Sequence, residues 1–258
     1  MSTSGAFREV GCALITTLPR LLTIPSYNPS CLFLETILRA RRIPYKTEQC
    51  SIWKVAPCDH LFPIVFVDGV YFRNVMSALE YLSIRHHYKV ENEMTPKQRG
   101  EAVAIGSLLD QLSWMISYSR SFNNQWIADD KAILEGFTKL QLYFWRNLIV
   151  PRQKKKLEKR CRAYGLSGAK MQDEVHYLTE SLLEALCTLL ADKTYFFGVK
   201  SPSWLDFKAF SVLAQFKFTP VLKDSRLKQF MKDRTPNLVK LVNKMKTDFW
   251  PEWETADD

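Results

Sequence analysis

The spacing of apolar positions divides the chain into two parts. In the first 90 residues, short apolar runs at positions 12–18, 45–50 and 64–72 predict β-strands. The last run contains Asp68-Gly69, the strongest short signal for a β-hairpin, so it is expected to form two strands.

Two helices are expected among these strands. Asn28-Pro29 opens the first, because Asn is a favoured N-cap and Pro a favoured first helical residue, and Asn74 caps the second. Glu35 and Arg39 lie four residues apart in the first helix and are expected to pair on its outer face. The order of strand, helix, strand, hairpin and helix is that of a thioredoxin-like domain, whose first two strands are joined by a right-handed crossover.

From Thr95 onward, the apolar positions follow helical spacing only. Apolar stripes lie at 105–116, 133–148, 175–189 and 238–245. Ser203 and Asp206 predict the start of a further helix with a variant capping box. The sequence therefore predicts a thioredoxin-like α/β domain at 1–88, a polar linker at 89–99 and an all-α domain at 100–258, each with its own core.

Composition and charge exclude several classes of protein. The chain has 258 residues, 47% of them hydrophobic, and a formal net charge of +9, which excludes a disordered or fibrous protein. Six scattered cysteines without a CxxC pair exclude a disulfide scaffold and indicate reduced thiols in a cytoplasmic protein.

The four histidines form no HExxH motif, and neither His86-His87 nor Cys58-x-His60 has a second pair of ligands, so no metal is expected. The apolar run at 11–18 is too short to cross a bilayer, which needs about twenty helical residues.

Several stretches of this layout resemble one protein family. Residues 25–45, PSYNPSCLFLETILRARRIPY, are similar to the first helix of failed axon connections proteins and their metaxin relatives. Residues 192–216 resemble the helical-domain signature of glutathione transferases, with Gly198, Ser203 and Asp206 in register. The ending DFWPEW, at 248–253, resembles the terminus of failed axon connections proteins. The resemblance covers nearly all of residues 12–254 and implies the two-domain fold of soluble glutathione transferases.

The same resemblance implies where a glutathione crevice would lie. Phe62-Pro63 resembles the position of the cis-proline of this superfamily. Asn74-Val75 stands where glutathione-binding transferases place an acidic residue or Gln followed by Ser. Val75 has no hydroxyl for the γ-glutamyl carboxylate, and Arg73 replaces the lost polarity only in part. Asn74 is therefore interpreted as an ordinary N-cap, and glutathione is a candidate ligand without being an assigned cofactor.

Cys31 is the candidate nucleophile. It lies in the first turn of the first helix, where redox-active members of the superfamily place theirs, and a helix N-terminus favours the thiolate. Its position on the apolar helix face with Leu34 favours instead a structural role as a small hydrophobic residue. Tyr27 and Ser26, in the preceding loop, are alternative groups for hydrogen-bonding a thiolate.

Segment 51–60 is interrupted by a proline and is too short for the second helix of transferases. Metaxins similarly have a loop at this position, so the short segment counts against an enzyme.

Residues 152–162, RQKKKLEKRCR, contain seven cations and one acid. On a helix, Leu157 and Cys161 share a face that is expected to pack on the bundle. The other face consists of Arg152, Lys155, Lys156, Lys159 and Arg162. We interpret this basic face first as a solvated surface, and second as a contact for anionic lipid headgroups or an acidic protein partner. No recognition-helix or zinc-finger motif accompanies it, so specific nucleic-acid binding is not expected.

The residues and the resemblance together leave three functional hypotheses. The preferred one is a non-conjugating binding or adaptor module, which the resemblance links to axon development or signalling. The alternative is a glutathione-dependent transferase or thiol transferase that uses Cys31. A further alternative is a metaxin-like protein peripheral to the mitochondrial outer membrane. A homodimer is common for the fold, although no residue pattern points to an interface.

Overall fold

The computed structural model describes residues 11–17, 20, 23–49, 62–88, 94–122, 138–144, 147–148, 150–166, 168, 170–197, 200–219 and 226–253. Four described strands form one mixed sheet in the order β2-β1-β3-β4. They are β1 (Ala13–Thr17), β2 (Tyr45–Gln49), β3 (Ile64–Val67) and β4 (Val70–Phe72). Strand β1 is parallel to β2 and antiparallel to β3, and β3 is antiparallel to β4. The fold class predicted from strand and turn signals is confirmed.

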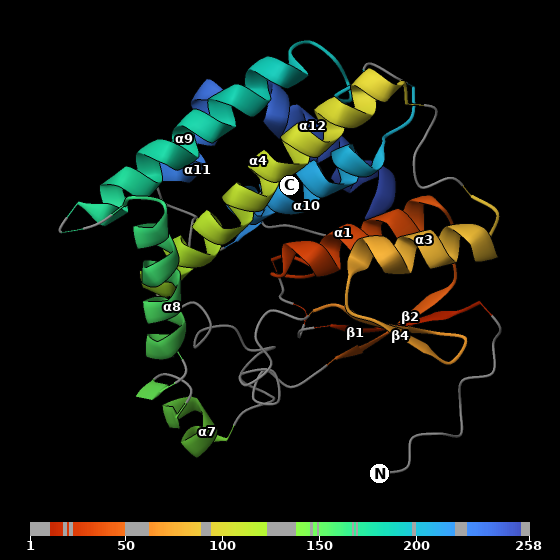
Figure 1. Ribbon diagram of the computed structural model, residues 1–258, viewed down its shortest axis with the longest axis horizontal. Helices are drawn as coiled ribbons and strands as arrows, with labels where there is room; N and C mark the ends of the chain where they lie inside the picture. The colour runs from red at the N-terminus through yellow and green to blue at the C-terminus, as the bar shows by residue number, and fades with distance from the viewer. Residues whose placement is uncertain are drawn as a thin grey trace.

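Helices α1 (Pro29–Ala40) and α3 (Val75–Arg85) lie on the same face of the sheet, toward the helical part of the molecule (Figure 1). Both begin at the predicted caps. The Asn28 side chain accepts hydrogen bonds from the backbone of Ser30 and Cys31, and the Asn74 side chain accepts one from Ser77. Each Asn thereby satisfies N–H groups that a helix start leaves without an intrahelical partner.

The remaining described helices form the all-α part. They are α4 (Pro96–Phe122), α7 (Lys139–Phe144), α8 (Val150–Ala163), α9 (Met171–Leu190), α10 (Trp204–Phe218), α11 (Arg226–Arg234) and α12 (Pro236–Phe249). Helix α10 is apolar nearly all round and therefore lies at the centre, in contact with α1, α4, α11 and α12. Helix α4 begins at Pro96, so the last four residues of the predicted linker are helical.

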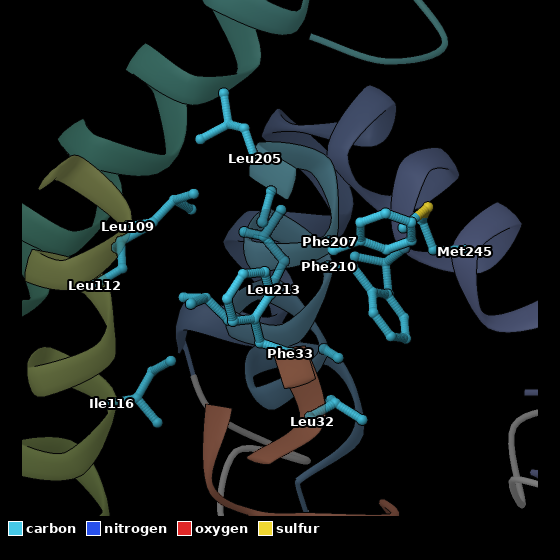
Figure 2. Close-up of a cluster of buried hydrophobic side chains, with 14 of the residues drawn as sticks. Leu32, Phe33, Leu109, Leu112, Ile116, Leu205, Phe207, Phe210, Leu213 and Met245 are labelled. Carbon is cyan, nitrogen blue, oxygen red and sulfur yellow. The ribbon is translucent and has the colours of Figure 1, made fainter. Parts of the chain in front are cut away.

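One hydrophobic core joins the sheet, α1 and the helical part. Leu32 and Phe33 of α1 meet Phe210 and Leu213 of α10, beside Leu109 of α4 (Figure 2). The cluster of buried side chains is continuous from the first strand to the C-terminal segment. The expectation of a separate core for each part is therefore wrong, because α1 is apolar on the side that faces α10 as well as on the side that faces the sheet.

The segment after α12 returns to α1. Trp250 is buried, and its indole N–H donates to the Thr36 hydroxyl at 3.0 Å. The Arg39 guanidinium lies 3.7 Å from the centroid of the Trp250 ring and forms an ion pair with Glu252. Trp253 donates to the backbone oxygen of Thr23 at 3.1 Å. The DFWPEW sequence thus attaches the end of the helical part to the first helix of the α/β part.

Glu35 does not lie on the outer face of α1. It is buried and pairs with Arg20, whose Nη2 lies 2.6 Å from Glu35 Oε2, whereas Arg39 donates to the Tyr45 hydroxyl. The predicted direct i,i+4 pair on the outer face is wrong, because the Tyr45 hydroxyl lies between the two side chains. It accepts from Arg39 and donates to Glu35 Oε2 at 3.5 Å, and Arg39 also lies over the Trp250 ring.

The apolar stripe predicted at 133–148 is described only from residue 138 onward, so Ile133 and Phe137 lie outside the described residues. Within α7 and just after it, Leu140, Phe144 and Leu148 are exposed rather than packed in the bundle. Helical spacing brought these side chains to one face, but no described element covers that face.

Candidate functional site

The loop before α1 and the first turn of α1 hold the three candidate reactive groups. Ser26 is buried, Tyr27 is half-buried, and Cys31 is the third residue of the helix. The Asn28 cap fixes this turn, because its Oδ1 accepts from the Cys31 backbone N–H at 3.2 Å. The sequence therefore placed these residues on the correct element.

Cys31 lies under two aromatic side chains. Its exposed fraction is 0%, and it forms a small apolar cluster with Phe62, on which the Tyr27 ring packs. The Phe62–Pro63 peptide bond is cis, as in the superfamily that the sequence resembles, and both residues are buried just before β3. The structure thus brings together Tyr27, Cys31 and Phe62, with the Cys31 sulfur inside the cluster and out of contact with solvent.

The Tyr27 phenol keeps its proton throughout the physiological range. Burial raises its pKa strongly, and the nearby Cys31 sulfur raises it further, whereas the Arg120 guanidinium acts in the opposite direction. A protonated phenol is a hydrogen-bond donor, which is the role required of a tyrosine that stabilises a thiolate. The chemistry of Tyr27 is therefore compatible with a transferase, but its neighbour Cys31 is covered.

Arg73 and Asn74 lie in the loop between β4 and α3, and both are exposed. The Asn74 Oδ1 accepts from the Ser77 backbone N–H at 3.1 Å, so its side chain is engaged as a helix cap. The half-buried Val75 follows as the first residue of α3 and presents methyl groups where a hydroxyl would serve a carboxylate.

Sequence reasoning missed a buried guanidinium beneath this loop. Arg120 of α4 donates to the Tyr27 carbonyl at 2.7 Å, to Gln215 Oε1 at 2.5 Å and to Thr219 Oγ1 at 2.7 Å. Gln215 in turn donates to the Ser26 carbonyl at 3.0 Å. Burial lowers the pKa of Arg120 to about 10, so the side chain is still a cation at neutral pH.

This network fixes the Ser26–Tyr27 backbone to α4 and α10. Its sequence signal was the position of Arg120, four residues after Ile116 in an otherwise apolar stripe. A charged residue on the buried face of a helix indicates a specific polar partner inside the protein, because an unpaired buried charge is costly.

Ser203 and Asp206, two of the helical signature residues, have structural roles. Asp206 is buried and accepts hydrogen bonds from the Ser203 backbone N–H at 2.8 Å, the Ser203 hydroxyl at 2.6 Å and the Phe196 backbone N–H at 2.8 Å. The predicted capping box of α10 is present. Burial raises the pKa of Asp206, and these hydrogen bonds offset part of the increase. Gly198 lies outside the described residues.

The basic face of α8 is exposed at all five predicted positions, and Leu157 and Cys161 lie on the side that faces the bundle.

The metal prediction is tested only for the described residues, among which no three His, Cys, Asp or Glu side chains form a group that can hold a metal ion. His86 instead contacts the Gly11 carbonyl at 2.8 Å through Nε2. Cys58, His60 and the rest of segment 51–60 lie outside the described residues. None of the described helices is long and apolar enough to cross a membrane.

Comparisons with known proteins agree with this geometry. Residues 29–126 match the model of the glutathione S-transferase N-terminal domain, and residues 179–245 match that of the glutathione S-transferase C-terminal domain. The chain is 26% identical over 238 residues to Failed axon connections of Drosophila melanogaster. This match covers 90% of the chain but only 56% of the length of the fly protein.

Solved transferases have the same fold at low sequence identity. The β-etherase LigF of Sphingobium sp. strain SYK-6 is 16% identical with a TM-score of 0.63, over 93% of this chain and 99% of that one. A glutathione S-transferase of Ceriporiopsis subvermispora, solved in complex with glutathione, is 13% identical with a TM-score of 0.61, over 95% of this chain and 99% of that one. At these identities the likeness establishes the fold alone.

Proposed function

We propose that this chain, which belongs to the glutathione S-transferase superfamily and is related to Failed axon connections, is a binding or adaptor module that does not conjugate glutathione. The observation that supports this function best is the burial of Cys31 under Tyr27 and Phe62. A thiol must reach its electrophile or disulfide to react, and the 0% exposure of this side chain prevents that approach.

The N-terminus of α3 supports the same function. Asn74 uses its side-chain oxygen to cap the helix, and Val75 has no hydroxyl to add to a carboxylate site. Glutathione would therefore lose at this position a polar contact that glutathione-binding members of the superfamily make.

The cellular setting is proposed from the relative and from the sequence. The name of the fly protein suggests a role in axon development or signalling, to which this chain would contribute as an adaptor. We place it in the cytoplasm, with a metaxin-like position at the mitochondrial outer membrane as the alternative.

A homodimer is supported by exposed apolar side chains on the edge strand β4 and on α3. They are Val70, Tyr71, Met76 and Ile84.

The second candidate function is a glutathione-dependent transferase or thiol transferase. One observation favours it: Cys31 lies in the first turn of α1, next to the protonated Tyr27 phenol. This function requires Phe62 or Tyr27 to move away from the sulfur during the reaction.

A direct assay separates the two functions. The purified protein should pass through immobilised glutathione without retention and should not accelerate conjugation of glutathione to a chloronitrobenzene. Cys31→Ser should then leave the background rate unchanged, as should the control Cys187→Ser on α9.

Turnover by the unmodified protein would overturn the proposed function. Loss of that turnover in Cys31→Ser, but not in Cys187→Ser, would establish Cys31 as the nucleophile. A tenfold change in rate corresponds to about 1.4 kcal/mol at the transition state, so even partial activity is measurable.

A further inference from the structure

Helices α7 and α8 lie at one side of the helical part, where α7 projects away from the sheet and the bundle (Figure 1). Four large apolar side chains in and after α7 face solvent. They are Leu140, Tyr143, Phe144 and Leu148. Leu140 is 65% exposed and Tyr143 is 62% exposed. Leu140 lies three and four residues before Tyr143 and Phe144, so these side chains share one face of α7, and Leu148 follows the helix.

The orientation of α8 is fixed by its contact with α4. Cys161 is buried and Leu157 is half-buried on this side of the helix. The Arg160 guanidinium lies 5.4 Å from the centroid of the Trp114 ring, and that ring stacks on Tyr164 at 5.2 Å. Helix α8 therefore cannot turn its cations inward, and its basic face stays in solvent.

The basic face and the apolar patch are adjacent in the chain. The patch ends at Leu148, and the first cation of the basic face is Arg152. Residues 152–162 contain seven cations, and Glu158 is their one acid, half-buried at the side of the basic face. An apolar stripe next to concentrated positive charge is the composition of segments that lie in the interface of anionic bilayers.

We propose that α7 and α8 together form a docking surface for an anionic phospholipid bilayer. The lysines and arginines of the basic face contact the headgroups, and the apolar patch enters the boundary between headgroups and acyl chains. This inference is independent of glutathione binding, because it uses neither Cys31 nor the loop before α1.

The exposed apolar patch favours a bilayer over a nucleic acid. A duplex presents phosphates that suit the cations, but it offers no comparable apolar layer for Leu140 and Phe144. An acidic protein remains an outcome of the test, since it can supply both carboxylates and an apolar surface.

The test is co-sedimentation of the full chain with vesicles of phosphatidylcholine containing phosphatidylserine, and with vesicles of phosphatidylcholine alone. Binding is expected only to the anionic vesicles and should weaken as the salt concentration rises. Lys155→Gln, Lys156→Gln and Lys159→Gln together should weaken it about a hundredfold, because each cation near a membrane surface contributes about a factor of five.

The control removes the same charge elsewhere. Lys193, Lys232 and Lys240 are exposed in the turn after α9, on α11 and on α12. Their combined change to Gln should leave vesicle binding within about twofold of the original, because they lie outside the docking surface.

The apolar patch has its own variant and control. Leu140→Ser with Tyr143→Ser should reduce vesicle binding while thermal stability is unchanged, since both side chains are exposed. Leu189→Ser with Tyr177→Ser, at two exposed positions of α9, should leave binding unchanged.

The outcomes decide the proposal. Binding that requires anionic lipid and is lost in both α7 and α8 variants supports it. Absence of binding to anionic vesicles, equal losses in the control variants, or binding to polyglutamate or duplex DNA with none to vesicles would each overturn it.

Discussion

The Glu35 carboxyl group is buried beside the Arg20 guanidinium, which offsets only part of the effect of burial. Burial raises its pKa above the ordinary value of 4.5, and the Arg20 guanidinium, 2.6 Å from Oε2, offsets only part of that increase. Burial therefore disfavours the ionised carboxylate in the folded protein by more than the nearby guanidinium stabilises it. Tyr45 shares this site and has its own pKa raised by burial and by the neighbouring carboxylate.

The titration of Glu35 predicts a dependence of stability on pH. Because its pKa is higher in the folded than in the unfolded chain, the folded state binds more protons between the two values. Stability is greatest below the unfolded pKa and is lost as the pH rises through the folded one. In Glu35→Gln, the free energy of unfolding should therefore decline less between about pH 4 and about pH 7 than in the original protein.

Urea unfolding at constant ionic strength across this range measures the effect. Glu184→Gln, at an exposed position of α9, is the matched control and should follow the original protein. Asp206 has a pKa shifted in the same direction and is unchanged in both variants, so part of the decline should persist. An equal or steeper decline in Glu35→Gln would show that the Arg20 pairing outweighs burial.

Buried polar partners are the residue-scale feature that the sequence predicted least. Arg120 was missed although it continues an apolar stripe, and its acceptors at Tyr27, Gln215 and Thr219 are more than ninety positions away. Only the docking of α1 onto α4 and α10 brings them together. The same limit explains Glu35, whose partner Arg20 lies outside its helix.

Elements whose boundaries depend on local chemistry were predicted well. Asn28-Pro29, Asp68-Gly69 and the capping box at Ser203 each act within a few residues, so the sequence contained all that was needed. The stripe at 133–148 was different. Helical spacing determines which residues share a face, but it does not determine whether another element covers that face.

The attachment of the C-terminal segment to α1 gives a prediction for these elements. Trp250→Ala should lower the free energy of unfolding by about 3–5 kcal/mol, because it removes a buried indole that packs on α1 and donates to Thr36. Chemical denaturation followed by circular dichroism measures this loss. Trp250→Phe should cost less, since it keeps an aromatic ring for Arg39 and removes mainly the hydrogen bond.

Tyr177→Ala is the control for the loss of an aromatic side chain, because Tyr177 is exposed on α9. It should change the free energy of unfolding by less than about 0.5 kcal/mol. A Trp250→Ala variant as stable as Tyr177→Ala would mean that the Trp250 side chain contributes nothing to the stability of the fold.

At the scale of the whole molecule, one continuous core determines how the protein unfolds. The sequence suggested two cores because the rhythm of its elements changes near residue 90, but a change of rhythm describes local structure only. Leu32 and Phe33 belong to the first part and are buried against Phe210 and Leu213 of the second (Figure 2). Opening the α/β part alone would expose both sides of this contact to water.

The shared core therefore predicts a single cooperative transition. Native-state hydrogen exchange should give the most protected amides of α1 and of α10 the same free energy of opening, equal to that of global unfolding. Phe33→Ala should lower both values together, by about 3–5 kcal/mol, whereas Glu80→Ala at an exposed position of α3 should change neither by more than about 0.5 kcal/mol. Lower protection confined to the sheet, α1 and α3 would show that the α/β part opens alone. In that case the contact between α1 and α10 would be a dissociable interface between two domains, and Cys31 would become accessible whenever that interface opened.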